Sequence, residues 1–420
     1  MKTLRYATIV LVALFAFGCA AHRVEAPEKV KEPLLTIEQF QERWQVIVDT
    51  YIKPLPDTQE ARLACFQKLI TKGLEECLGD RQSHYLSKEK MSAMYEDIQG
   101  FYAGIGLELS DDMPVKIVSI LEDSPAQRSG MFEVGDTIIE VDGKDVTREA
   151  TVRVAGKIRG LAGTDITMRV KRGGNMLSPI PLVRARIVNH PVHAMDIDEN
   201  ITYIKIGQFN QQTPGELFDE MTKRLLVLLN DDVGIFNPRL KKFVIDLRGN
   251  PGGLVEVVGM MSYLFADSED DIVITTMSRK GEEVNHAGQF VRDISLIPVG
   301  IFREVELSVL IDGGSASASE IFAEFLHQSM GVPLVGKKSY GKGSVQQIIS
   351  FEEGDALYIT IAEYVVGKNK TRINKIGIQP EYEVEGKAPV RKTSHDPLAD
   401  PANDPQLRKA IELLRAKPRN

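Results

Sequence analysis

Three segments of the sequence combine glycines with residue types that can do nucleophilic chemistry. Asp246–Gly253 ends an apolar stretch with an Arg-Gly-Asn-Pro-Gly-Gly run, and Asp312–Ile321 holds three serines at alternate positions. Ser339–Gln346 places Lys342 between two glycines. Backbone N–H groups in such turns can stabilise a developing anion. A hydroxyl at a helix N-terminus also lies in positive potential, so these segments offer a nucleophile, a base and anion-binding turns.

Each segment also has a structural explanation. A serine before a helix is a common N-cap, although three alternating serines exceed what one cap needs. The first glycine turn could equally hold a phosphate or make a tight connection. The sequence lacks the zinc-protease, P-loop and nucleophile-elbow motifs, and His190 and His193 have no evident third metal ligand. The residue types alone therefore leave a Ser/Lys pair and purely structural roles open.

The elements around these segments predict an alternating α/β core. Apolar runs predict strands, and stripes of three- and four-residue spacing predict helices between them. Such alternation is typical of a layered α/β architecture. The expected strands are 201–206, 242–247, 272–278, 307–311, 356–364, 375–378 and 381–385, and the expected helices are 214–229, 255–265 and 317–328.

A second, β-rich region precedes this core. From Phe101 the pattern predicts strands at 104–109 and 115–120, a short helix at Pro125, a strand, turn and strand within 134–143, a helix at 147–159 and a final strand at 165–171. The Ser-Pro-Ala, Val-Gly-Asp and Val-Asp-Gly stretches occur in the order typical of a PDZ domain, which this region resembles.

The PDZ resemblance implies that a peptide adds a strand beside residues 105–109. Its terminal carboxylate would meet backbone N–H groups of the loop 101–106, and apolar ends would fill the groove beside the helix. The residues expected to bind the tail are Phe101, Tyr102, Ala103, Gly104, Ile105, Gly106, Leu107, Leu109, Val154 and Ile158.

The three glycine-containing segments, in this order behind a PDZ domain, resemble the carboxyl-terminal processing (tail-specific) serine proteases. The match covers about residues 36–385 and includes Cys77–Leu86, where Asp80 and His84 are displaced from the family pattern. The resemblance implies a crotonase-like α/β protease core with an inserted PDZ domain and helical N- and C-terminal segments. It implies no metal or other cofactor, and it implies the C-terminal tails of proteins as substrates.

Carried over by position, the resemblance makes Ser317 the nucleophile and Lys342, twenty-five residues later, the general base. Gln346 would orient the lysine, and Glu320 matches a frequently functional acid. The oxyanion donors would be the N–H of Ala318 and one from Gly249–Gly253, for which we take Gly252 and Gly253 as candidates. Neutral lysine at pH 7 requires burial, which lowers the pKa of an amine.

The N-terminus predicts export. Basic residues precede the apolar run Ala7–Phe17, which spans roughly 17 Å and is too short for a ~30 Å hydrocarbon core. Gly18-Cys19 resembles a bacterial lipobox, although the two residues before Gly18 depart from it. We therefore expect lipidation of Cys19 and a periplasmic, membrane-anchored protein. Ala20 favours the outer membrane.

These features predict six regions: a signal peptide with the lipobox-like cysteine, a polar tether, an N-terminal helical segment, the PDZ domain, the protease core, and a linker with a terminal helix at 405–416. Their expected bounds are 1–19, 20–35, 36–99, 100–187, 188–385 and 386–420.

Composition agrees with this reading and limits the alternatives. The net charge of −8 over 420 residues argues against a nucleic-acid binder. Cys65 and Cys77 lie twelve residues apart in one expected helix, too far for a disulfide unless the helix kinks at Gly73, so both are expected to be buried thiols. A non-catalytic, membrane-tethered PDZ adaptor is the main alternative function. Cleavage sequence, any activating adaptor and homo-oligomer formation stay open.

Overall fold

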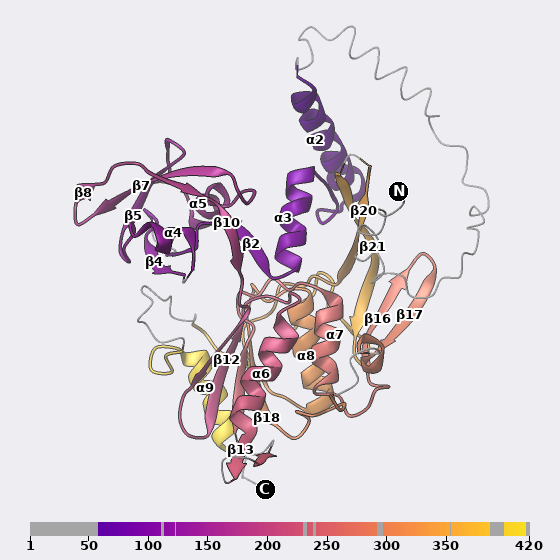
Figure 1. Cartoon of the computed structure of the whole chain (residues 1–420). Helices are drawn as coiled ribbons and strands as arrows, with labels where there is room; N and C mark the ends of the chain where they lie inside the picture. Colours follow the sequence, from indigo (N-terminus) through magenta and orange to yellow (C-terminus); the bar gives the residue numbers. More distant parts are fainter. Residues whose placement is uncertain are drawn as a thin grey trace, which may run out of the picture. The chain divides into compact units, whose positions relative to one another are not determined.

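The computed structural model describes residues 58–110, 113–121, 123–229, 233–237, 241–291, 297–352, 354–386 and 399–416 (Figure 1). The predicted signal peptide, Cys19 and tether lie outside these residues. The chain divides into two compact units between Phe66 and Gln67, and the second unit contains the sheets described below. Within the described ranges, no helix is both long and apolar enough to cross a membrane.

A six-stranded sheet forms the centre of the α/β core, in the order β11-β12-β15-β18-β19-β23. The edge strand β11 is antiparallel to β12, and all the other pairs are parallel. The strands are β11 (Val192–Asp196), β12 (Ile201–Ile206), β15 (Lys242–Asp246), β18 (Glu306–Ile311), β19 (Leu334–Gly336) and β23 (Tyr382–Glu383).

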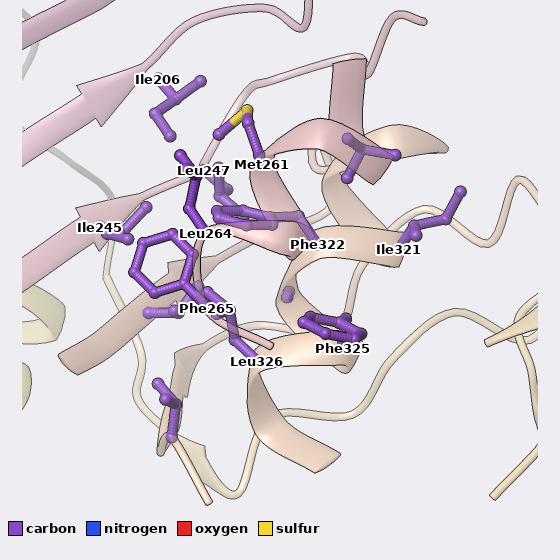
Figure 2. Close-up of a cluster of buried hydrophobic side chains, with 14 of the residues drawn as sticks. Ile206, Ile245, Leu247, Met261, Leu264, Phe265, Ile321, Phe322, Phe325 and Leu326 are labelled. Atoms are coloured by element: carbon purple, nitrogen blue, oxygen red, sulfur yellow. The ribbon is translucent and has the colours of Figure 1, made fainter. Parts of the chain in front are cut away.

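The two faces of this sheet bury different helices, because successive strand residues point to opposite sides. On one face, Phe243 and Ile245 pack with residues of α6 (Thr213–Leu225), α7 (Val255–Tyr263) and α8 (Ala318–Met330). Figure 2 shows part of this cluster, where Phe322 of α8 lies near Met261 and Leu264.

On the other face of the sheet, Val244 and Leu310 pack against α9 (Pro405–Ala416). Helix α9 has the bounds predicted from the sequence. The central strands are therefore covered on both faces, which explains their nearly continuous apolar sequences.

A second sheet is built around the long strand β21 (Ala356–Val366), in the order β1-β21-β16-β17, with β20 and β22 also paired to β21. Strand β20 begins two residues after Lys342, so the chain enters this sheet directly after the lysine. The other strands are β1 (His84–Leu86), β16 (Ile272–Ser278), β17 (Gly281–His286), β20 (Ser344–Ser350) and β22 (Thr371–Arg372).

The β-rich region has its own apolar core, which includes Ile105, Val141, Val154 and Met168. Strand β2 pairs with β10, β3 with β4, and β5, β6, β7, β8 and β9 form a further sheet. The strands are β2 (Phe101–Gly104), β3 (Leu107–Leu109), β4 (Ile117–Ile120), β5 (Thr137–Val141), β6 (Lys144–Asp145), β7 (Asp165–Arg172), β8 (Asn175–Met176), β9 (Ile180–Val183) and β10 (Ala185–Val188). The helices are α4 (Pro125–Ser129) and α5 (Thr151–Ile158).

The remaining elements are short or lie before the β-rich region. Helix α3 begins after Ser87, whose hydroxyl accepts a hydrogen bond from the Lys90 N–H as an N-cap. The elements are α2 (Gln59–Leu78), α3 (Lys88–Ile98), β13 (Leu226–Leu229), β14 (Val233–Phe236) and the 3₁₀ turn η1 (Ala287–Phe290).

Several sequence predictions need correction. Asp165–Arg172 is not the last strand of the β-rich region, since β8, β9 and β10 follow it. The expected helix 214–229 ends at Leu225, and Leu226–Leu229 forms a strand, because an apolar run of four suits either structure. Residues 375–378 form no strand. Helix α2 runs through Gly73 without a break, and Cys65 is free but only half buried.

Candidate active site

Three loops meet where neighbouring parallel strands end. The turn 247–253 follows β15, the loop 312–317 follows β18, and the loop 337–343 follows β19. Because β15, β18 and β19 are adjacent and parallel, their carboxyl ends lie at one edge of the sheet. The sheet order therefore brings together the three glycine-containing segments that the sequence singled out.

Ser317 lies at the N-cap of α8 with φ +56° and ψ −118°. Residues other than glycine rarely adopt this backbone conformation, because it costs free energy. Where it does occur, it is often at a functional site. Ser317 is 8% exposed, so it is nearly buried yet still reachable. Its backbone N–H donates to Oε2 of Glu320 at 2.8 Å.

Glu320 is fully buried and joins the loop that contains Ser317 to the loop that contains Lys342. Its Oε2 also accepts from the Lys342 N–H at 2.9 Å, and its Oε1 accepts from the Gly341 N–H at 2.7 Å and from the Ser339 hydroxyl. Burial raises the pKa of Glu320, and these hydrogen bonds only partly offset that effect. The carboxylate thus fixes the backbones of Ser317 and Lys342 relative to each other.

Lys342 is half buried, and burial lowers the pKa of its amine. In the described part of the chain, its Nζ makes no hydrogen bond or ion pair, and in particular none with the Ser317 hydroxyl. Tyr364, a buried residue of β21, donates from its phenol to the Lys342 carbonyl. Burial and the Glu320 charge raise the pKa of Tyr364, whereas a hydrogen bond with Ser317 lowers it. Tyr364 therefore lies beside both residues of the predicted pair.

Gln346 lies on β20, and its amide nitrogen is already engaged. Nε2 donates to the hydroxyls of Ser344 at 2.7 Å and Thr360 at 3.2 Å. The Ser83 hydroxyl in turn accepts from the Thr360 N–H at 2.8 Å. Within the described residues, Gln346 makes no hydrogen bond to Lys342. Its amide nitrogen can only donate and is already used, so its amide oxygen is the atom that can accept a hydrogen bond from the lysine amine.

Gly252 lies directly against Ser317, the predicted nucleophile. A β-carbon there would be 2.6 Å from the Ala316 carbonyl oxygen, 2.8 Å from the Ser317 β-carbon and 3.0 Å from the Ala318 nitrogen. Gly252 has φ +101°, and its N–H donates to Asn250 Oδ1 at 2.9 Å. Glycine is therefore required at this position.

Two backbone N–H groups near Ser317 remain available for an anion. Those of Gly253 and Ala318 donate to no other group in the described ranges. Since the Gly252 N–H is engaged by Asn250, Gly253 is the better candidate of the two predicted glycines.

Sequence reasoning missed Tyr364 and Thr360. Both lie on β21, a strand without glycines or a recognisable motif beside them, so their position became visible only through the strand pairing.

A cavity of about 400 Å³ is lined mainly by the β-rich region, together with Asn189, His190 and His193, and most of the predicted tail-binding residues border it. Val154 and Ala103 are instead buried, and the Phe101 ring is covered by the Arg186 guanidinium, 3.5 Å from the ring centroid. Additional lining residues include Glu108, Leu121, Ala155 and Arg159. The predicted residues that line the cavity are Tyr102, Gly104, Ile105, Gly106, Leu107, Leu109 and Ile158.

The mouth of this groove has the backbone geometry for a carboxylate. Gly106 has φ +78°, and a β-carbon there would be 2.1 Å from the Ser124 β-carbon, so only glycine fits. In the described structure, the N–H groups of Ile105 and Gly106 donate to no other residue. They are therefore free to receive an anionic group.

The described residues contain no group of three or more His, Cys, Asp or Glu side chains placed to hold a metal ion. His190 instead contacts Glu216 Oε1 through Nδ1 at 2.7 Å, and His193 lies in β11.

The fold and the site define a serine-type peptidase, a hydrolase, that carries a PDZ domain. Residues 200–384 match the model of peptidase family S41, and residues 102–179 match that of the PDZ domain. The chain is 30% identical over 391 residues to a carboxy-terminal-processing protease of Bartonella bacilliformis, covering 86% of each chain. This chain belongs to peptidase family S41, among the carboxy-terminal processing proteases.

Two further similarities are more distant. The chain is 31% identical over 315 residues to the carboxy-terminal processing protease CtpA of Bacillus subtilis, covering 75% of this chain and 63% of that protein. Among solved structures, a photosystem II D1 C-terminal processing protease matches with 22% identity and a TM-score of 0.46, over 84% of this chain and 94% of that one.

Proposed function

We propose that this protein is an exported endopeptidase that recognises the C-terminal tails of protein substrates with its PDZ domain and cleaves peptide bonds with Ser317 and Lys342. The observation that carries the proposal is the Glu320 carboxylate, which accepts hydrogen bonds from both the Ser317 N–H and the Lys342 N–H. Its direct test is the activity of Ser317 and Lys342 variants on an unfolded protein.

The proposed reaction is acyl transfer. Neutral Lys342 takes the hydroxyl proton of Ser317 while Oγ attacks the scissile carbonyl carbon. The N–H groups of Ala318 and Gly253 receive the oxyanion of the tetrahedral intermediate. The protonated lysine then gives its proton to the leaving amine, and an acyl-enzyme on Ser317 results. Water attacks this ester with Lys342 as base again, releasing the new C-terminus.

Gln346 is proposed to orient the lysine through its amide oxygen. The hydroxyls of Ser344 and Thr360 accept from Nε2 and thereby fix which end of the amide points toward an amine. Tyr364 is proposed to hold the lysine loop through the Lys342 carbonyl.

The pH dependence follows from the lowered pKa of Lys342. Because Lys342 must be neutral to act as the base, kcat/KM should rise as the pH passes through the pKa of Lys342 and should be constant above it. The midpoint of this rise should lie below the usual lysine value of 10.5. The measurement is kcat/KM of a short peptide between pH 5 and 10. A rise centred near the ordinary lysine value would contradict a base that is already desolvated in the free enzyme.

Tail recognition should depend on the charge of the substrate's end. The N–H groups of Ile105 and Gly106 would donate to the carboxylate, so amidation replaces charge-assisted hydrogen bonds by weaker ones. The expected loss is about 1.5–3 kcal/mol, or about 10- to 100-fold in affinity. Binding of one peptide with a free or amidated C-terminus measures this. Equal affinity of the two would show that the groove does not read the carboxylate.

We also propose that Cys19 carries lipid and holds the protein on the periplasmic side of the bacterial envelope. The apolar run followed by Gly18-Cys19 supports this. Wild-type protein should partition into detergent, whereas Cys19→Ser should remain in the aqueous phase. A wild-type protein that is soluble and has a free N-terminus after Cys19 would reduce the motif to an ordinary signal peptide.

A further inference from the structure

Arg248 belongs to the turn 247–253, and its side chain is 5% exposed. All five of its N–H donors are used. Nε and one N–H of Nη2 bond Asp246, at 3.0 and 2.6 Å, and the other N–H of Nη2 bonds Asp404 at 2.7 Å. Nη1 bonds Asp404 at 3.1 Å and Gln406 at 2.9 Å. A single guanidinium therefore joins the turn to residues more than 150 positions later in the chain.

The partners of Arg248 are themselves buried and hydrogen-bonded. Asp246, Asp404 and Gln406 are each 1% exposed. Asp404 Oδ1 also accepts from the Gln406 and Leu407 N–H groups, so it caps the first turn of α9. Burial alone would raise the pKa of Asp246, but the charges of Lys205 and Arg248 and the hydrogen bonds from Arg248 and Tyr203 lower it to about 2. The cluster thus holds two carboxylates and the Arg248 guanidinium out of water, with the partly exposed Lys205 amine beside Asp246.

The turn is also held from its other side. The Gly249 N–H donates to Asp312 Oδ1 at 2.8 Å, and the Asn250 carbonyl accepts from the Ala316 N–H at 3.0 Å. The nucleophile loop therefore fixes one side of the turn, and the start of α9 fixes the other through Arg248. Gly252 and Gly253, where the proposed oxyanion donor is found, follow directly after these attachments in the same turn.

We propose that Asp404 and Gln406 are positioning residues for catalysis: by holding Arg248, the C-terminal segment sets the place of the turn that supplies the oxyanion donor. Neither residue touches substrate. The inference rests on the proposed function, because it needs an oxyanion to stabilise. A displacement of the donor by about 1 Å can cost about 100-fold in rate, so undocking this segment would disable the enzyme without removing any catalytic side chain.

The test compares two ways of weakening α9. Asp404→Ala removes the two hydrogen bonds that Asp404 accepts from Arg248, whereas Leu414→Ala removes a buried contact at the far end of the same helix. At 20 °C, Asp404→Ala should lower kcat by about 10- to 100-fold with KM within threefold of wild type. Leu414→Ala should lower the melting temperature but leave kcat within threefold.

A second readout separates positioning from a merely structural role. A peptide aldehyde forms a tetrahedral adduct with a serine hydroxyl, whereas the matching peptide alcohol binds without one. Asp404→Ala should weaken the aldehyde in parallel with kcat and leave the affinity of the alcohol unchanged. If Asp404→Ala does not fold, Asp404→Asn replaces it: asparagine still caps the helix but loses the charge facing Arg248, and an intermediate loss in kcat is expected.

Wild-type kcat in a folded Asp404 variant, or an equal loss of kcat in Leu414→Ala, would overturn the inference. Ser317→Ala is measured beside them. If Ser317→Ala is inactive while the Asp404 variants are fully active, only this inference fails. If Ser317→Ala is itself active, the proposed function fails.

Discussion

Ser317→Ala is expected to lower kcat/KM on an unfolded protein by about 10³-fold or more while the protein remains folded. The reason is the loss of the only atom that forms the acyl bond. Lys342→Met should have a similar effect, and the double variant should be hardly worse than either single one, because the residues act as a unit. The measurement is the initial rate of peptide release beside wild-type enzyme.

Lys342→Met should also unfold at a higher temperature than wild type near neutral pH. The folded protein lowers the pKa of Lys342, so between that pKa and the usual value of 10.5 the unfolded state binds more protons. Stability therefore falls as the pH drops through this window, and an apolar side chain removes the penalty. A variant that is inactive yet more stable would mark Lys342 as a functional residue.

The control for the nucleophile is Ser315→Ala. The Ser315 hydroxyl is buried and donates to the Leu247 carbonyl at 2.8 Å, so Ser315 has a structural role. Ser315→Ala should retain measurable cleavage. If it is inactive and Ser317→Ala is not, the nucleophile is assigned to the wrong serine. If every variant cleaves like wild type, a non-catalytic adaptor becomes the better description.

Gly252→Ala is expected to lower kcat by about 10²- to 10³-fold, comparable to the loss of an oxyanion donor. The added β-carbon would be within 3.0 Å of backbone atoms of Ala316 and Ala318, and φ +101° disfavours alanine. The turn must shift, and the proposed donor at Gly253 shifts with it. Binding of a C-terminal peptide by the PDZ domain should not change.

The matched substitution is Gly215→Ala in helix α6, where a β-carbon would meet no atom within 4 Å. Alanine also favours the helix by about 1 kcal/mol relative to glycine, so this variant should be fully active and slightly more stable. Wild-type kcat in a folded Gly252→Ala enzyme would contradict the proposed position of the oxyanion site.

The sequence predicted elements best where local pattern and burial agree. Helix α9 was predicted with its observed bounds, because Pro405 starts a clear apolar stripe. Strand β1, His84–Leu86, was missed inside a region expected to be helical. It has only three residues and exists because it pairs with β21, some 270 positions away. No local pattern encodes such a partner. The crotonase-like description of the core stays a prediction.

The candidate site was predictable where glycines and chemistry-bearing residues coincide in sequence, as at Gly252, Ser317 and Lys342. The resemblance supplied Glu320, and the structure adds a physical reason: a buried carboxylate with four donors. Asp404 could not be found in this way. Its partner Arg248 lies in another element, and an aspartate before a helix normally indicates only an N-cap.

The parallel pairing of β15, β18 and β19 also determines when the folding chain gains peptidase activity. Their loops are separated by roughly 65 and 25 residues of chain, and closing such long loops costs entropy before any contact compensates for it. A newly synthesised chain that has formed only its local helices therefore has Ser317 but lacks the backbone donors proposed to face it. Proteolytic competence therefore arrives only with the completed sheet.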